Sequence, residues 1–124
     1  MQQMKKKILV VDDFKNSLAI LKMTLEMKKY EVHTATNGQE ALNLFKTQKF
    51  DLLLSDYNMP IMNGLELVKQ IKSLPEYRNF PIVIVSTDMD EIKKRDALRA
   101  GVTYWLKKPF KMEELIKVVE RIIL

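Results

Sequence analysis

The sequence predicts a single α/β domain, spanning residues 1–124, with a parallel β-sheet covered by helices on both faces. Short apolar runs alternate with helical patterns five times from one end of the chain to the other, which is typical of βαβ units. No repeat, linker or low-complexity segment interrupts the alternation. Polar and charged residues follow most of the apolar runs, so the carboxyl ends of the strands are the first place to look for function.

The first two strands differ in polarity. Lys7–Val11 is a β-branched apolar run, and Glu31–Ala35 is more polar, as an edge strand would be. Asn37 is a candidate N-cap for the second helix, with Glu40 completing a capping-box pattern. The apolar stripes of the first two helices are predicted at Phe14, Leu18, Leu21 and Leu25, and at Ala41, Leu42 and Phe45.

The third and fourth strands are the most apolar segments. Leu52–Ser55 is the third strand, and Ile82–Val85 is apolar on both faces, which favours a central position. Between them Gly64 precedes a third helix, and Pro75 and Pro81 indicate a loop. The stripe of this helix is Leu65, Leu67, Val68 and Ile71.

The last part of the chain contains a weak helix, a short strand and a strong helix. Asp90–Ala100 has a thin apolar stripe among charges, and Gly101 stands where a helix stop is expected. Tyr104–Leu106 is a short fifth strand. The stripe of the weak helix is Ile92, Ala97 and Leu98; that of the final helix is Met112, Leu115, Ile116, Val119, Ile122 and Ile123.

The polar second strand and the short fifth strand belong at the edges of the sheet. With right-handed crossovers this predicts the order 2-1-3-4-5, a flavodoxin-like doubly wound sheet with five helices. Its binding crevice lies at the carboxyl ends of strands one and three.

Composition narrows the function classes. The chain lacks cysteine, which excludes disulfides and thiolate metal sites and suits a cytoplasmic protein. No apolar run approaches the roughly 18 residues that a membrane span needs, so no membrane association is expected. The net charge is +5, but the basic residues are dispersed, and we expect no direct nucleic-acid binding.

Functional side chains converge on one edge of the predicted sheet. Asp12 and Asp13 follow strand one, and Asp56 follows strand three. Three clustered carboxylates favour Mg²⁺, and we expect Asp13 and Asp56 as direct ligands, Asp12 through water, and the backbone carbonyl of Asn58 as a further ligand. A carboxylate beside Mg²⁺ can attack phosphorus, which makes Asp56 a candidate phosphoacceptor. From strands four and five, Ser86 would donate a hydrogen bond to the phosphoryl group and Lys108 would neutralise its charge.

These residues, in this order and each near a strand end, resemble the receiver domain of two-component response regulators, close to the single-domain chemotaxis type. The resemblance covers Ile8 to Ile123. The matching residues are Val10-Val11-Asp12-Asp13, Asp56-Tyr57-Asn58-Met59-Pro60, Met62-Asn63-Gly64, Ser86, Ala100-Gly101 and Lys108-Pro109-Phe110.

The resemblance implies a phosphorylation switch without catalytic output. Asp56 would take a phosphoryl group from a sensor histidine kinase with Mg²⁺, in a domain that assists its own phosphorylation and dephosphorylation. Ser86 and Trp105 would be the switch residues, and the fourth helix, fifth strand and fifth helix would form the face that controls a downstream protein. The resemblance also implies a cis Lys108–Pro109 bond. For the oligomeric state we expect a monomer or a weak phosphorylation-dependent dimer.

Two positions depart from the family pattern, and two others are positions that affect dephosphorylation in the family. Trp105 stands where Tyr or Phe is commoner, and Thr87 stands where Ala is frequent, so Thr87 is expected to limit access to the phosphate. Asn58 and Asp88 occupy positions that tune dephosphorylation in the family.

Two other functions are compatible with this architecture. A Mg²⁺-dependent phosphohydrolase would use Asp56 as nucleophile, although Asn58 stands where haloacid-dehalogenase-type phosphatases carry a second Asp. A nucleotide- or flavin-binding module ranks last, since the first loop is acidic and lacks glycine.

Three further expectations concern the remaining residues. The eight methionines are expected to fill the core. The basic cluster Lys93-Lys94-Arg95 with Arg99 is expected to be a solvated face. The thin stripe of the fourth helix makes that helix the candidate mobile element.

Overall fold

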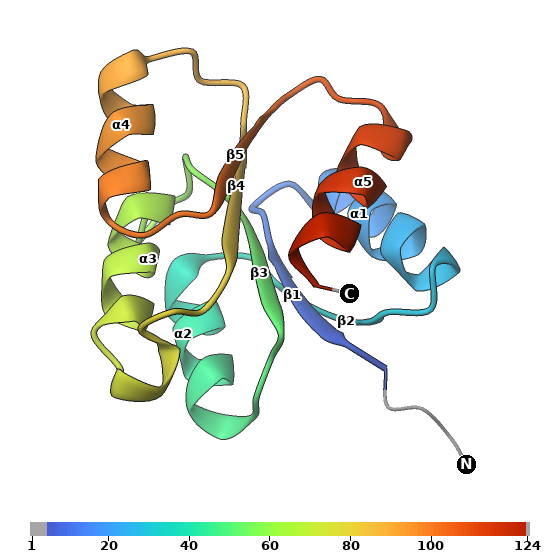
Figure 1. Cartoon of the computed structure of the whole chain (residues 1–124), viewed down its shortest axis with the longest axis horizontal. Helices are drawn as coiled ribbons and strands as arrows, with labels where there is room; N and C mark the ends of the chain where they lie inside the picture. The colour runs from blue at the N-terminus through green and yellow to red at the C-terminus, as the bar shows by residue number, and fades with distance from the viewer. Residues whose placement is uncertain (1–4, 124) are drawn as a thin grey trace.

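A computed structural model describes residues 5–123 and has three layers, with one β-sheet between two layers of helices (Figure 1). The sheet contains five parallel strands in the order β2-β1-β3-β4-β5, so the predicted fold class and strand order are confirmed. The strands are β1 (Lys7–Val11), β2 (Glu31–Ala35), β3 (Leu52–Asp56), β4 (Ile82–Ser86) and β5 (Tyr104–Lys107).

Helices α1 and α5 cover one face of the sheet, and α2, α3 and α4 cover the other (Figure 1). A short 3₁₀ turn, η1, occupies part of the segment predicted as a loop. The helices are α1 (Lys15–Met27), α2 (Gly38–Thr47), α3 (Gly64–Lys72), α4 (Glu91–Arg99) and α5 (Met112–Ile122), with η1 at Pro75–Tyr77.

The strands supply two apolar cores because successive side chains point to opposite faces. Leu53 and Ile84 belong to the core beneath α2, α3 and α4. Leu54 and Val83 belong to the core beneath α1 and α5, and they are paired across β3 and β4. All four are fully or almost fully buried, so the central strands are held from both sides.

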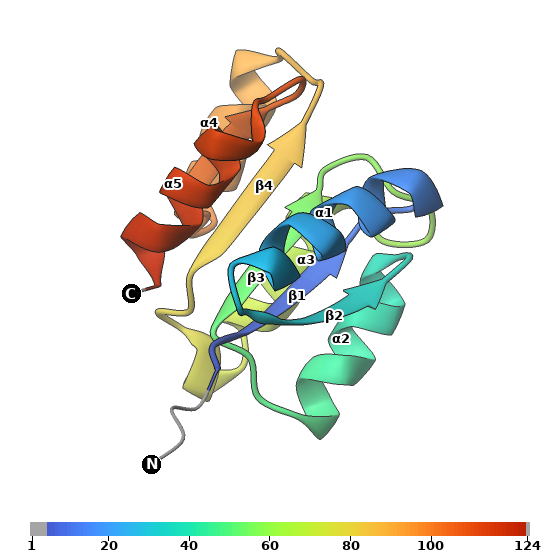
Figure 2. The same cartoon turned by 90° about the vertical axis from the view of Figure 1, so that its right-hand side faces the viewer.

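All strands end at the same edge of the sheet, where the arrowheads point in Figure 2. Strands β3, β4 and β5 each extend one residue further than predicted, to Asp56, Ser86 and Lys107. The extension follows from pairing, since Asp56 is in register with Val85 and Ser86 with Lys107. Asp56 and Ser86 therefore stand on the strands and not in the loops beyond them. Helix α5 runs back toward the opposite edge, where β1 begins (Figure 2).

The start of α1 differs from the sequence prediction. Phe14 was expected on the buried stripe, but it precedes the helix and its side chain is 68% exposed. Its backbone N–H donates to the Asp12 carboxylate at 2.9 Å, which turns the chain before the helix begins. The rest of the predicted stripe, Leu18, Leu21 and Leu25, is buried as expected.

The helix caps partly follow the predicted pattern. The Asn37 side chain accepts from the Glu40 N–H at 2.8 Å, as predicted, but the Glu40 carboxylate accepts from the Thr36 hydroxyl and does not return to the cap. A complete capping box instead starts α3, where Asn63 and Glu66 bond each other's backbone N–H groups.

Helix α4 has the fewest buried residues of the five helices. Ala97 is its only buried residue, whereas Ile92 and Leu98 of the predicted stripe are 59% and 45% exposed. The helix ends before Gly101, whose φ of 112° suits glycine, so the predicted stop is confirmed. A side chain at Gly101 would also meet Lys72, whose ammonium donates to two carbonyls of the α3–β4 connection.

The six methionines within residues 5–123 do not fill the core, and Met1 and Met4 lie outside the described residues. Four of them are largely exposed: Met23, Met27, Met89 and Met112. Met59 and Met62 are only partly buried against the core beneath α2, α3 and α4. Across residues 5–123, the helices are too short or too polar for any of them to cross a membrane.

Candidate functional site

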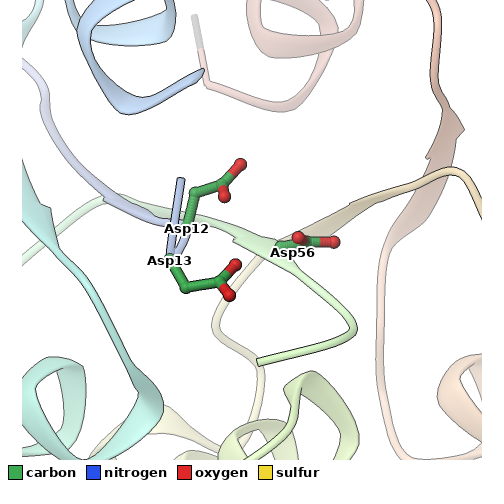
Figure 3. Close-up of side chains that lie close together, drawn as sticks. All are labelled: Asp12, Asp13 and Asp56. Atoms are coloured by element: carbon green, nitrogen blue, oxygen red, sulfur yellow. The ribbon is translucent and has the colours of Figure 1, made fainter. Parts of the chain in front are cut away.

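Three carboxylates lie together at the carboxyl edge of the sheet. Asp12 and Asp13 follow the end of β1, and Asp56 ends β3, the neighbouring strand (Figure 3). One carboxylate oxygen from each lies within 4.8 Å of the others. The juxtaposition predicted from topology is therefore present.

Asp12 is a buried charge with two partners. Only 2% of the residue is exposed. One carboxylate oxygen accepts the Phe14 N–H at 2.9 Å, and the other lies 3.1 Å from the Lys108 ammonium. A buried carboxylate is stable in its charged form only when it is paired in this way.

Asp56 is in a less favourable environment. Burial raises the pKa of Asp56, Lys108 opposes that effect, and the charges of Asp12 and Asp13 add to the rise. Its Oδ1 accepts the Tyr57 N–H at 2.8 Å, while Oδ2 is 4.0 Å from the Lys108 ammonium. The Asp56 carboxylate is thus held in place but incompletely neutralised.

Lys108 follows β5, and its ammonium lies near two of the three carboxylates. Its backbone N–H donates to the Ser86 carbonyl at 2.8 Å, which continues the pairing of β4 and β5 beyond the last strand residue. The Lys108–Pro109 peptide bond is cis, as the resemblance implied. Lys107, by contrast, is exposed.

The remaining predicted residues surround this cluster. Ser86 is completely buried at the end of β4, and its hydroxyl oxygen accepts the Asp88 N–H at 3.0 Å. Thr87 and Asn58 are exposed in the loops after β4 and β3. Asp88 is partly buried, and its pKa is lowered chiefly by the Lys93 ammonium and next by the hydrogen bond from the Asp90 N–H.

Trp105 lies on β5 and is half-buried. Its ring is 5.4 Å from that of Tyr57, at an interplanar angle of 48°. Tyr57 is itself buried and directly follows Asp56. The predicted switch aromatic therefore contacts the neighbour of the predicted phosphoacceptor.

Sequence reasoning missed the position of Lys93. It was grouped with solvated basic residues, yet its ammonium lies 2.8 Å from Asp88 and 5.5 Å from the centroid of the Tyr57 ring. One signal was available: because side chains alternate along a strand, Tyr57 must point away from Asp56, toward the face that carries α4. The reach of a lysine side chain has no sequence signature.

Gly64 allows the next helix to approach this edge closely. A Cβ there would lie 2.7 Å from the Asp56 carbonyl oxygen and 2.9 Å from Tyr57 Cα. The Gly64 N–H donates to the Tyr57 carbonyl at 2.7 Å. The start of α3 is therefore fixed against the backbone that carries Asp56.

The donor set is suitable for a hard divalent cation. It consists of carboxylate oxygens, without sulfur or imidazole, and its excess negative charge is only partly balanced by Lys108. Mg²⁺ prefers such oxygen ligands and usually retains several waters.

Residues 8–120 match the response regulator receiver domain family. The chain belongs to this family. The chemotaxis protein CheY homolog of Campylobacter jejuni is 38% identical over 119 residues, which cover 94% of this chain and 92% of the relative. Chemotaxis protein CheY1 of Helicobacter pylori is 37% identical over 94% of this chain and 96% of its own length. The transcriptional regulatory protein PhoP of Bacillus subtilis is 36% identical over 97% of this chain but only 49% of PhoP.

Solved receiver structures show the same fold. The chemotaxis response regulator CheY4 of Vibrio cholerae superimposes with a TM-score of 0.91 at 38% identity, covering 97% of this chain and all of CheY4. The receiver domain of sensor histidine kinase PA1611 from Pseudomonas aeruginosa has a TM-score of 0.89 at 26% identity, over 97% of this chain and 98% of that domain. In that structure a magnesium ion is coordinated in the active-site cleft. The chain is thus a CheY-like receiver domain of two-component signalling, a class that acts downstream of sensor kinases and upstream of target proteins.

Proposed function

We propose that this receiver domain is a phosphorylation-driven switch in which Asp56 is the phosphoacceptor. The observation that carries the proposal is the cluster of Asp12, Asp13 and Asp56 with the Lys108 ammonium beside it. Phosphoryl transfer depends mainly on positioning and on neutralising charge, and this cluster supplies both.

In the proposed reaction, a carboxylate oxygen of Asp56 attacks the phosphorus of a phosphohistidine on a sensor histidine kinase. An O–P bond forms, the N–P bond breaks, and the imidazole leaves with the electron pair. The product is an aspartyl phosphate on this chain. The hydrogen bond from the Tyr57 N–H to Oδ1 orients the carboxylate for this attack.

The residues that would hold Mg²⁺ are those expected from the sequence. Asp13 and Asp56 would bind it directly, Asp12 through water, and the backbone carbonyl of Asn58 would be a further ligand. When bound, the ion supplies positive charge against the phosphoryl oxygens and the carboxylates.

Lys108 and Ser86 act on the phosphoryl group in this proposal. The Lys108 ammonium, already near Asp12 and Asp56, neutralises a phosphoryl oxygen. The Ser86 hydroxyl donates a hydrogen bond to another oxygen, and Trp105 turns inward in response. Thr87, Asn58 and Asp88 line the approach and tune the access of water to the acyl phosphate.

The output surface in this proposal is the face formed by α4, β5 and α5. Apolar side chains are exposed there, including Ile92, Leu98 and Tyr104. A groove of about 290 Å³ lies between β5 and α5, and Leu106, Val118 and Ile122 are among the residues that line it. A downstream protein would bind this face according to the phosphorylation state.

A phosphorylation assay tests the proposal directly. The protein is incubated with a small phosphodonor such as acetyl phosphate, with and without Mg²⁺, and intact-mass spectrometry counts the phosphoryl groups on each chain. We expect one group per chain, requiring Mg²⁺ and lost in Asp56→Asn. Asp51→Asn, which alters an acid at the opposite edge of the sheet, is the matched control and should be phosphorylated normally.

The same assay separates the switch from a phosphohydrolase. A switch traps one phosphoryl group and releases phosphate slowly. Sustained turnover of phosphomonoesters through Asp56 would instead identify an enzyme and overturn the proposal.

A further inference from the structure

Lys93 connects α4 to the segments that follow β3 and β4 at the carboxyl edge of the sheet. It is the third residue of α4, and its ammonium lies 2.8 Å from the Asp88 carboxylate and 5.5 Å from the centroid of the Tyr57 ring. Asp88 belongs to the loop after β4, and Tyr57 follows β3. One charged group therefore contacts segments next to both Ser86 and Asp56.

The contact with Asp88 links Lys93 to the Ser86 hydroxyl through hydrogen bonds. The Asp88 backbone N–H donates to Ser86 Oγ at 3.0 Å, while its other carboxylate oxygen accepts the Asp90 N–H at 2.8 Å. Asp90 in turn caps α4 by accepting the Ile92 N–H. The loop from Ser86 to Lys93 is thus joined by consecutive hydrogen bonds, so the position of Asp88 fixes the orientation of the buried hydroxyl.

The contact with Tyr57 bears on Trp105. The Tyr57 ring contacts both groups: the Lys93 ammonium lies 5.5 Å from its centroid, and the half-buried ring of Trp105 lies 5.4 Å from it. A cation beside an aromatic ring is attracted to it, and it restricts where that ring can move. Lys93 is therefore linked to both residues that move in the proposed switch: to Ser86 through Asp88, and to Trp105 through Tyr57.

These polar contacts matter because α4 has little else to hold it. Ala97 is the only buried residue of the helix, and it lies one turn beyond Lys93. The Asp88 carboxylate is mostly covered, with 17% of its side chain exposed, whereas the Lys93 side chain is 41% exposed. Removing the ammonium would loosen the β4–α4 loop without opening the core.

We propose that Lys93 is a positioning residue that stabilises the resting orientation of Ser86 and Trp105 and thereby limits how readily the domain accepts a phosphoryl group. The proposal rests on the proposed function of Asp56. In the proposed switch the Ser86 side chain rotates toward a phosphoryl oxygen, which moves Oγ away from the Asp88 N–H and frees Asp88 to move from Lys93. The lysine therefore favours the resting state over the phosphorylated one.

The test uses beryllofluoride, a mimic of the phosphoryl group, in the presence of Mg²⁺. Trp105 is the single tryptophan of the chain, so its fluorescence reports binding at the switch. Lys93→Gln should bind beryllofluoride about threefold more tightly than the wild type, the scale of one surface ion pair with a cation–π contact. Lys93→Arg keeps the charge and should restore the wild-type affinity.

Arg95→Gln is the matched control, because it removes the same charge from an exposed position of the same helix. It should leave both the affinity and the unliganded Trp105 emission unchanged, whereas Lys93→Gln should shift that emission. The double variant Asp88→Asn/Lys93→Gln should bind no more tightly than Lys93→Gln alone, since both changes remove one contact.

The possible failures are distinct. If wild-type protein gives no response to beryllofluoride, the proposed function of Asp56 fails and the role of Lys93 fails with it. If the wild type responds but Lys93→Gln has the same or weaker affinity, only the role of Lys93 is overturned. An equal gain in Arg95→Gln would attribute the effect to net charge and would also overturn it.

Discussion

Asp56 has surroundings that disfavour its charged form. Burial and the two neighbouring carboxylates raise its pKa, against the effect of Lys108. The folded state therefore binds a proton at Asp56 more readily than the unfolded state does. Stability is then lost as the pH rises from the unfolded pKa through the folded pKa, and at neutral pH the ionised carboxylate destabilises the fold.

Asp56→Asn should consequently stabilise the protein at neutral pH in metal-free buffer. We expect the free energy of unfolding to rise by roughly 1 kcal/mol, with the gain disappearing below the unfolded pKa of an aspartate. Thermal unfolding at several pH values measures this. Asp96→Asn, an exposed acid on α4, should have almost no effect. If Asp56→Asn were less stable than the wild type without metal, the ionised Asp56 carboxylate would not be destabilising the fold.

Added Mg²⁺ should reverse the order of the two proteins. A ligand that binds only the folded state stabilises it by an amount that grows with the logarithm of its concentration over Kd, about 2.7 kcal/mol at one hundred times Kd. The wild type should gain this stabilisation, and Asp56→Asn should lose most of it. Measuring unfolding with and without Mg²⁺ separates the repulsion among the carboxylates from the stabilisation that they provide as Mg²⁺ ligands.

Ile61 has a costly backbone conformation. Its φ is 71°, and the Met62 N–H donates to the Pro60 carbonyl at 2.7 Å, so the three residues form a tight γ-turn. A β-branched residue rarely adopts positive φ, and with 77% of its surface exposed the side chain gains little from burial. The strain lies in the loop that follows Asp56.

Ile61→Asn should therefore increase the free energy of unfolding by about 1 kcal/mol, because asparagine tolerates positive φ. Denaturant unfolding measures the change. Ile20→Asn provides the control: Ile20 is also exposed but lies within α1, where the substitution should lower stability by a few tenths of a kcal/mol. Equal losses in both variants would show that the turn at Ile61 is not strained.

At the scale of elements, α4 is the segment with the fewest apolar anchors. Helix α3, of the same length, buries Leu67, Val68 and Ile71, whereas α4 buries only Ala97. Local opening requires less free energy where less apolar surface is buried.

Hydrogen exchange should be faster in Glu91–Arg99 than in Gly64–Lys72, by about tenfold or more. Mass spectrometry of peptides that cover the two helices measures the rates. Beryllofluoride with Mg²⁺ should alter exchange in α4 and leave α3 nearly unchanged. An unaltered rate in α4 would exclude this helix as the mobile element of the switch.

The elements were predictable from the sequence except at their ends. Apolar runs such as Leu52–Leu54 and Ile82–Val85 identify central strands, because both of their faces are buried. The last residues, Asp56 and Ser86, are polar and give no strand signal, and only pairing with a neighbouring strand extends the sheet to them. Phe14 was misplaced for a related reason: the Asp12 side chain bonds its N–H and delays the helix.

The candidate site was predictable to the extent that topology determines it. Parallel strands must bring Asp12, Asp56 and Lys108 to one edge, and the structure places them there. The contacts of Lys93 depend instead on how a long side chain packs across three segments. Strand alternation gives the face toward which Tyr57 points, but not the partner that the Lys93 ammonium contacts.

At the scale of the whole molecule, the sheet joins two cores into one folding unit. Leu53 packs under α2, α3 and α4, and Leu54 packs under α1 and α5, although the two residues are adjacent on β3. Loss of either side chain leaves a cavity against the same central strand.

Leu53→Ala and Leu54→Ala should each lower the free energy of unfolding by about 3 kcal/mol. Circular dichroism and Trp105 fluorescence should report the same midpoint in both variants, because the two cores share β3. Leu98→Ala, at a position 45% exposed, should change stability by less than about 0.5 kcal/mol. Separate transitions for the two faces would contradict a single folding unit.

The direction of the chain through the sheet has a consequence for larger assemblies. Strand β1 begins, and α5 ends, at the edge remote from Asp56, about 15 Å away along a five-residue strand. A neighbouring domain joined to either end would approach from that side and would leave the carboxylates accessible to a kinase. The same architecture therefore suits relatives of two lengths. This chain covers 96% of CheY1 of Helicobacter pylori but only 49% of the longer regulator PhoP.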